Sequence, residues 1–148
     1  MYKHILVATD GSKLSKKAIT TATRLASSLG ARLTGVYVVP ETLAPIYSEG
    51  SSYVPQMSPT RFREFHEGEA RKALSVLETE AQTAGVDCST VHLANNHAYA
   101  GILRAAKLKK CDLIVMASHG RRGLSAMLLG SETNKLLTHS SIPVLVCR

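Results

Sequence analysis

Short apolar runs rich in valine and isoleucine alternate along the chain with longer segments of helical period. Continuous apolar runs predict strands buried on both faces, because a half-exposed strand would alternate apolar and polar residues. Apolar residues that recur every three or four positions predict helices packed against these strands. The predicted strands cover residues 5–8, 32–39, 88–93, 112–117 and 142–147, and the predicted helices cover 14–29, 60–83, 99–108 and 131–139.

This order of elements predicts an α/β fold, an open doubly wound sheet of five parallel strands with helices on both faces. Right-handed crossovers favour the strand order 3-2-1-4-5, with the first strand at the centre. Ligands bind such sheets outside the carboxyl ends of the strands where the winding reverses, here the crevice between the first and fourth strands. A chain of 148 residues has the length of one domain, so we expect residues 1–148 to form a single unit.

Residues 40–59 hold four of the five prolines and predict a loop of a length typical of lids and binding segments. The following predicted helix carries the acidic residues of the chain's middle on its outer face. Its inner face is expected to include Phe62, Phe65, Leu74 and Leu77, which recur at helical spacing.

The composition is that of a folded protein with an excess of positive charge. Hydrophobic residues make up 45% and charged residues 20% of the chain, which excludes a disordered class. The formal net charge of +7 suits nucleic acid, a phosphorylated ligand or a membrane surface as partner. With 5% aromatic residues, no helix-turn-helix pattern and no basic amphipathic helix, we expect neither nucleic acid nor membrane. The basic excess lies in the two ends of the chain, which build the crevice, and otherwise in solvated helix faces.

Cysteine and histidine spacing excludes several site classes. Three scattered cysteines form neither a disulfide framework nor a CxxC metal site, and no apolar run reaches the length of a membrane span or a signal core. We therefore expect a cytoplasmic protein. None of the six histidines stands in HxxxH or HExxH spacing, so protein side chains alone predict no metal site.

A glycine-rich segment follows the fourth predicted strand. Residues 120–123 read Gly-Arg-Arg-Gly, and Gly130 and Ser131 begin the last predicted helix. Glycines let backbone N–H groups approach an anion, and a helix N-terminus adds unpaired N–H groups and the positive end of its dipole. The segment thus fits a phosphate cradle to which Ser131 adds a hydroxyl. The alternative is that the glycines form turns and that Ser131 caps the helix.

Asp10 follows the first predicted strand at the mouth of the same crevice. Its carboxylate suits a ribose hydroxyl or a metal ion, and equally the turn before the next helix. Neither a Walker A sequence nor GxGxxG occurs, which disfavours P-loop hydrolases and conventional dinucleotide enzymes. His119 stands beside Ser118 in the crevice, but neighbours in an extended segment point to opposite sides, so we expect no nucleophilic pair there.

The segments KHILVATDGS, VYVVP and MASHGRRGLSAMLLGSETNKLLTHSSIPVLVCR resemble the universal stress protein family along essentially the whole chain. ATP-binding members of that family carry Gly, two residues, Gly, nine residues, Gly and then Ser or Thr. Gly120, Gly130 and Ser131 match this spacing, whereas Ala117 replaces the first glycine. The resemblance implies an adenine nucleotide alpha hydrolase-like fold.

The resemblance also implies an ATP site, and the carboxylate of Asp10 offers a place for a Mg²⁺ ion beside it. Asp10 would lie near the ribose, Val38 would meet the adenine through its backbone, and Gly120, Gly130 and Ser131 would meet the phosphates. The resemblance implies these nucleotide-binding residues: Ala8, Thr9, Asp10, Val38, Met116, Ala117, Gly120, Gly130, Ser131, Glu132 and Thr133. Arg121 and Arg122 join them because their positive charge, inside the glycine-rich segment, suits the phosphates.

The favoured interpretation is an ATP-binding universal stress protein, a nucleotide-dependent stress-response and signalling module. A slow ATPase or phosphotransferase and a stress-related scaffold that binds no nucleotide are alternatives, and no catalytic residue is assigned because the sequence shows no dedicated general base. The resemblance implies a homodimer formed by antiparallel pairing of the last strand through Val144, Leu145 and Val146. The alternative is that this strand is covered within its own monomer.

Overall fold

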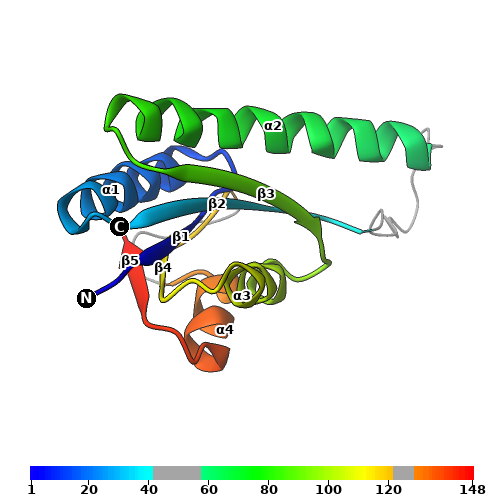
Figure 1. Cartoon of the computed structure of the whole chain (residues 1–148). Helices are drawn as coiled ribbons and strands as arrows, with labels where there is room; N and C mark the ends of the chain where they lie inside the picture. Colours follow the sequence, from blue (N-terminus) through cyan, green and yellow to red (C-terminus); the bar gives the residue numbers. More distant parts are fainter. Residues whose placement is uncertain (42–57, 122–128) are drawn as a thin grey trace.

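A five-stranded parallel sheet organises the protein, for which a computed structural model describes residues 1–41, 58–121 and 129–148. The sheet has the order β3-β2-β1-β4-β5, which confirms the predicted fold class and strand order (Figure 1). The elements are β1 (His4–Ala8), α1 (Lys13–Leu29), β2 (Arg32–Val39), α2 (Pro59–Thr83), β3 (Cys88–Ala94), α3 (Ala98–Lys109), β4 (Leu113–Ala117), α4 (Ser131–His139) and β5 (Val144–Cys147).

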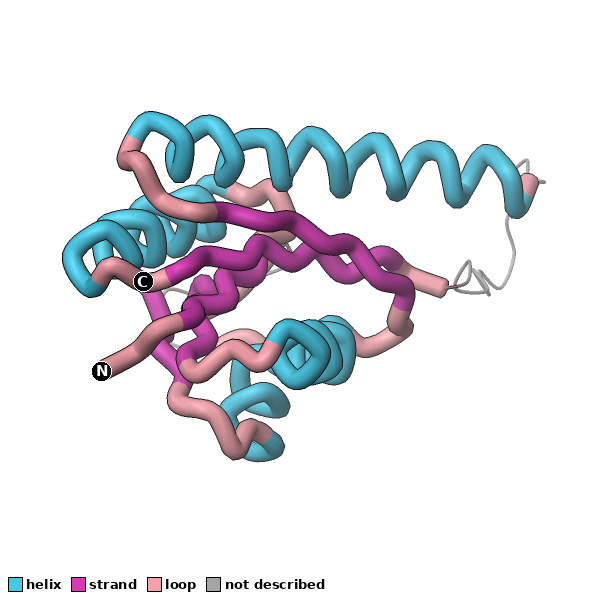
Figure 2. Tube along the Cα trace, in the orientation of Figure 1, coloured by secondary structure: helices cyan, strands magenta, loops and turns pink. Residues whose placement is uncertain are grey.

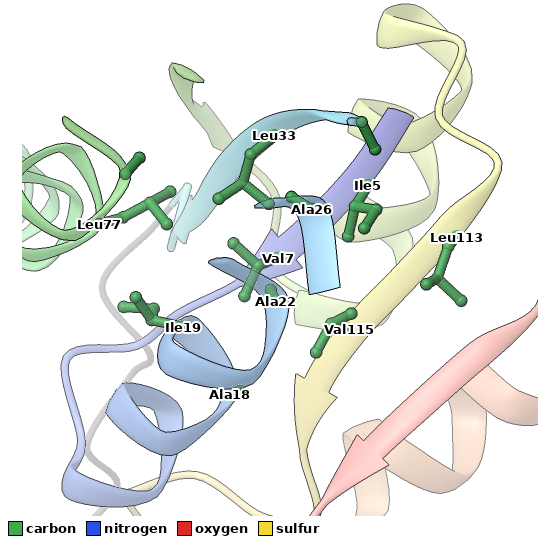
Figure 3. Packing of buried hydrophobic residues seen from close by; sticks show 12 residues of the cluster. Ile5, Val7, Ala18, Ile19, Ala22, Ala26, Leu33, Leu77, Leu113 and Val115 are labelled. Carbon is green, nitrogen blue, oxygen red and sulfur yellow. The ribbon is translucent and has the colours of Figure 1, made fainter. Parts of the chain in front are cut away.

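Helices cover both faces of the sheet: α1 and α2 lie on one side, and α3 and α4 lie on the other (Figures 1 and 2). Side chains alternate across β1, so Ile5 and Val7 belong to the core beneath α1, whereas Leu6 belongs to the core beneath α3 and α4. Figure 3 shows Ala18, Ala22 and Ala26 of α1 packed with this first core; their small side chains let the helix approach the sheet closely. The central strands are therefore buried on both faces, as their continuous apolar runs predict.

The first half of α2 departs from the predicted packing. The buried residues of α2 begin at Ala70, and the expected inner-face residue Phe65 is 55% exposed. The cause is geometric, because α2 continues past the ends of the strands and its first turns have no sheet beneath them (Figure 1). The interpretation of Phe65 as a core residue was wrong, whereas Leu74 and Leu77 are buried as expected.

Three further expectations concern the long loop, the cysteines and membrane-spanning helices. Most of the predicted loop 40–59 lies outside the described residues, as do residues 122–128. Cys88, Cys111 and Cys147 are free thiols, and burial raises the pKa of Cys88 and of Cys111 to about 11. Across residues 1–41, 58–121 and 129–148, we find no helix with the length and apolar character that crossing a membrane requires.

Two glycines that face different surroundings test the packing of α2 on the sheet. A Cβ on Gly35 of β2 would collide with the buried Leu77 side chain, whereas a Cβ on Gly68 would meet nothing within 4 Å. We expect Gly35→Ala to lower the free energy of unfolding by about 1–3 kcal/mol through overpacking. Gly68→Ala should raise it by up to about 1 kcal/mol, because alanine is the better helix former. Urea denaturation of both variants checks this, and equal effects would contradict the close approach of α2 to β2.

Candidate functional site

A cleft of about 460 Å³ opens at the carboxyl ends of the central strands. It lies where β1 and β4 diverge into their following loops, the place that the strand order predicts for a ligand. Its lining residues come from β1, β2 and β4, the loops after β1 and β4, and the N-terminal parts of α1, α3 and α4. They are Ala8, Thr9, Asp10, Ser15, Val36, Val38, Ala98, Ile102, Met116, Ala117, His119, Gly120, Arg121, Gly130, Ser131, Glu132 and Thr133.

The cleft brings together every residue expected at the nucleotide site except Arg122, which lies outside the described residues. Four lining residues were missed by sequence reasoning: Ser15, Val36, Ala98 and Ile102. The alternation of β2 contains the signal for Val36, because residues two apart in a strand share a face and Val38 was expected. Ile102 is buried in the core beneath α3 and α4, and nothing in its spacing distinguishes it from an ordinary core residue.

Asp10 joins the loops that follow β1 and β4. Its Oδ1 accepts a hydrogen bond from the backbone N–H of Ser12 at 2.9 Å, and its Oδ2 accepts one from the backbone N–H of Arg121 at 2.9 Å. Burial by itself would raise the pKa of Asp10, but hydrogen bonding from the side chain and backbone of Ser12 and from the backbone of Arg121 outweighs burial and holds the pKa below the ordinary value. Asp10 is therefore an ionised carboxylate that fixes the mouth of the cleft.

Gly120 is packed against this carboxylate. A Cβ at position 120 would stand 2.5 Å from Oδ2 of Asp10, closer than any side chain allows. The glycine is needed for space and not for backbone conformation, since its φ does not lie in the left-handed region. Only a residue without a side chain lets the loop after β4 come close enough for Arg121 to donate to Asp10.

The start of α4 forms the opposite rim. The backbone N–H of Gly130 donates to the Ser118 carbonyl at 2.8 Å, and a Cβ on Gly130 would meet the backbone of Ser118 and His119 at 3.3 Å. The buried Thr133 hydroxyl donates to the Ser118 carbonyl at 3.0 Å and so ties α4 to the end of β4. The N-cap residue of α4 is Gly130, which has no side chain that could cap the first N–H groups of the helix. Ser131, the first residue of α4, is exposed and lines the cleft.

Glu132 connects this rim to α3. One of its carboxylate oxygens accepts a hydrogen bond from the backbone N–H of Tyr99 at 2.8 Å, and the other lies 3.5 Å from the Lys135 ammonium. It therefore caps the N-terminus of α3, since the N-cap residue His97 makes no side-chain capping bond. The negative charge of Glu132 is thus already engaged by groups of the protein.

Ala117 occupies an ordinary strand position. It pairs with Cys147 across β4 and β5, and Lys110 is the one non-glycine residue of the described chain with a positive φ. The conformational freedom of a glycine is therefore not needed at position 117. The replacement adds only a methyl group to the wall of the cleft.

The Ser118 and His119 side chains point toward each other, contrary to expectation. The Ser118 hydroxyl and His119 Nδ1 lie 3.1 Å apart, because the chain has left the extended conformation after Ala117. His119 lines the cleft, whereas Ser118 is 4% exposed and does not. The two side chains therefore do not point to opposite sides, as we expected, but the Ser118 hydroxyl is buried and does not line the cleft.

The other end of the cleft is apolar. Val36, Val38, Ala98, Ile102 and Met116 form a wall between β2, β4 and α3. The cleft thus has an apolar compartment beside a polar one built from Asp10, backbone N–H groups and a hydroxyl. Among the residues that the structure describes, no group of three or more His, Cys, Asp or Glu side chains is placed to hold a metal ion.

A family profile, a curated relative and a solved structure all point to the same protein family. A sequence profile described as the universal stress protein family matches residues 1–148. The universal stress protein YxiE of Bacillus subtilis is 36% identical over 149 residues, with 100% of each chain covered. A crystal structure of a protein from the universal stress protein family from Burkholderia pseudomallei superposes with a TM-score of 0.75 at 29% identity, covering 98% of this chain and 95% of that one.

Two more distant structures are described as nucleotide complexes. A universal stress protein in complex with cAMP has a TM-score of 0.70 at 21% identity and covers 99% of this chain and 97% of its own. The universal stress protein from Archaeoglobus fulgidus in complex with dAMP has a TM-score of 0.73 at 17% identity and covers 99% and 98%. At these identities the likeness establishes the shared fold alone.

The contact between Gly120 and Asp10 predicts a coupled pair of substitutions. Gly120→Ala should lower the free energy of unfolding by about 1–3 kcal/mol, because the new methyl group displaces the carboxylate from its hydrogen bonds. With Asp10→Ala already present, the same change should cost less than about 0.5 kcal/mol, since no carboxylate remains to be displaced. Chemical denaturation of the two single variants and the double variant measures this coupling, and equal costs in both backgrounds would show that the contact is not formed.

Proposed function

The chain belongs to the universal stress protein family, and on that premise we propose that its cleft binds an adenine nucleotide, ATP together with Mg²⁺. One observation carries the proposal: the uncapped N-terminus of α4 opens on the same cleft as Asp10 and an apolar wall. A nucleotide needs these three features together, because its phosphates, ribose and base differ in polarity. The volume of about 460 Å³ lies within the range of pockets that hold small ligands.

The proposed phosphate contacts are made by the start of α4. Backbone N–H groups at a helix N-terminus, with the positive end of the helix dipole, stabilise an anion without a dedicated cation. The exposed hydroxyl of Ser131 adds a donor at this point. Gly120 and Gly130 keep the neighbouring backbone open, because a side chain at either position would meet Asp10 or the backbone of residues 118–119.

Asp10 suits the ribose and a magnesium ion. A carboxylate has more lone pairs than the two hydrogen bonds that Asp10 already accepts. Mg²⁺ is commonly held by one or two carboxylates together with phosphates and water, so a single aspartate is a sufficient protein contribution. The ion would supply charge neutralisation for the phosphates.

The apolar compartment is the proposed place of the base. Val38 lines it from β2, and Met116 and Ile102 line it from β4 and α3. The structures described as cAMP and dAMP complexes support an adenine nucleotide, because they share this fold. The choice of ATP rests on the match of Gly120, Gly130 and Ser131 to the spacing of ATP-binding members of the family.

We propose a binding and signalling role rather than catalysis. The two carboxylates that line the cleft, Asp10 and Glu132, already accept backbone hydrogen bonds. Asp10 thereby holds the loop after β4, and Glu132 caps α3, so we assign neither of them as a general base. Because Glu132 lies at the proposed phosphate site and caps α3, a bound phosphate changes the surroundings of both helices. The nucleotide would thereby shift the conformational population of the module.

We also propose that the protein works in the reducing cytoplasm, because Cys88, Cys111 and Cys147 are free thiols.

The proposed assembly is a homodimer through β5. This strand lies at one edge of the sheet and pairs with β4 on its other side. Val144 and Val146 are half-buried, and Leu145 is 38% exposed. Antiparallel pairing with β5 of a second copy would satisfy the free edge and cover Leu145.

The phosphate contact can be tested at Ser131. Calorimetric titration with ATP and MgCl₂ should show binding that Ser131→Ala weakens by about tenfold, the contribution of one hydrogen bond to a charged group. Ser131→Thr should bind like the unaltered protein, because it keeps the hydroxyl. Thr138→Ala, which removes a hydroxyl from the far end of α4, serves as a control. Absence of binding at millimolar ATP, or equal affinity of Ser131→Ala, would overturn the proposed site.

The dimer can be tested with two leucines of similar exposure. Leu145 on β5 is 38% exposed, and Leu137 on α4 is 40% exposed. Leu145→Glu should weaken dimerisation by at least about tenfold, because it replaces buried apolar area by charge at the pairing edge. Leu137→Glu should leave the dimer unchanged. Sedimentation equilibrium measures both, and a monomeric unaltered protein or equal behaviour of the variants would refute pairing through β5.

A further inference from the structure

A second, smaller cavity lies on the other side of the turn formed by Asp10 and Gly11. It has a volume of about 110 Å³ and is bounded by α1, α2 and the loop after β4. It shares only Thr9 and Arg121 with the larger cleft. Its lining residues are Thr9, Gly11, Lys16, Ile19, Glu69, Lys72, Ala73, Val76 and Arg121.

Three cationic side chains from three separate elements meet at this cavity. Lys16 comes from the first turns of α1, Lys72 comes from α2, and Arg121 comes from the loop after β4. Glu69 is the one carboxylate among the lining residues, so the wall carries an excess of positive charge. A concave surface with like charges from converging elements attracts small anions.

The carboxylate of Glu69 neutralises part of this positive charge. Its carboxylate lies 3.2 Å from the Arg121 guanidinium and 3.9 Å from the Lys72 ammonium. The side chain of Glu69 is 24% exposed, whereas those of Lys72 and Arg121 are 83% and 50% exposed. The chain's own carboxylate thus stands where an external anion would find two of the three cations.

Gly11 provides the room for this arrangement. Its φ is +80°, and a Cβ on it would lie 2.9 Å from Nη2 of Arg121. The guanidinium therefore reaches toward α2 across a residue that has no side chain. As a result Arg121, which was expected to serve the larger cleft, has its charged group paired with Glu69 of α2.

We propose that this cavity is a separate binding site for a phosphate-sized oxyanion, and that Glu69 is an internal competitor for it. The volume equals that of about three or four water molecules, so it admits one phosphate group and is far too small for a nucleotide. An incoming phosphate takes the place of the Glu69 carboxylate on Arg121 and Lys72 and gains Lys16 as a third partner. The site is separate from the larger cleft, because Arg121 lines both cavities but neither Lys16 nor Lys72 lines the larger one.

Inorganic phosphate is the probe for this site. It is titrated into the ¹⁵N-labelled protein at near-neutral pH, and the backbone amides are followed by NMR. A parallel titration with chloride at matched ionic strength removes the effect of screening. We expect saturable, phosphate-specific shifts at Gly11, Lys16 and Ala73.

Matched variants then separate the site from general surface charge. Glu69→Gln should tighten phosphate binding by about two- to fivefold, the size of a part-exposed ion pair, because it removes the competitor. Lys16→Ala and Lys72→Ala should weaken binding by a similar factor. The controls are Glu67→Gln and Lys17→Ala, which alter charges on the same two helices outside the cavity lining and should change nothing.

Three results would overturn the proposal. These are shifts confined to Gly130 and Ser131 in the larger cleft, shifts that chloride reproduces, and binding that Glu69→Gln leaves unchanged or weakens. The outcome is distinguishable from that of the nucleotide experiment, because no nucleotide is present and because Ser131→Ala should leave these phosphate shifts intact.

Discussion

The carboxylate of Asp10 joins two loops that are far apart in the chain, and the geometry of the cleft depends on this contact. Its oxygens accept the backbone N–H groups of Ser12 and Arg121, one from each of the loops leaving β1 and β4. In a doubly wound sheet these loops diverge because the helices that follow lie on opposite faces. The hydrogen bonds oppose that divergence locally, and Gly120 makes them possible by leaving room for the carboxylate. The mouth of the cleft is thus a fixed structure rather than a gap between loops.

The groups that the cleft offers to a negatively charged ligand belong mainly to the backbone. Asp10 and Glu132 line it as carboxylates, whereas the guanidinium of Arg121 pairs with Glu69 on α2. Within the described residues, the features of the cleft that suit a phosphate are therefore the N-terminus of α4, the Ser131 hydroxyl and the open backbone at Gly130. None of the described residues that line the larger cleft is a lysine, although the chain has a net charge of +7. Some of that charge lies instead around the smaller cavity beyond Gly11.

Sequence reasoning works best here where one physical rule decides. Continuous apolar runs predict the buried strands, and α1 ends at Gly30, whose φ of +62° is the usual helix stop. The burial of a side chain is harder to predict from sequence where it depends on how far a helix and the sheet beneath it extend. The period of α2 places Phe65 on the inner face, but the sheet ends before the helix does. Likewise, the contact of Ser118 with His119 depends on the bend after Ala117, and the pairing of Arg121 with Glu69 joins residues that no local pattern connects.

The most direct test of the central claim is a crystal structure of the protein grown with ATP and MgCl₂. We expect difference density with the phosphates at the N–H groups of Ser131 and its neighbours, the ribose beside Asp10 and the base against Val38. Density for a nucleotide elsewhere on the molecule, or an empty cleft at millimolar ATP, would contradict the assignment of this cleft as the nucleotide site.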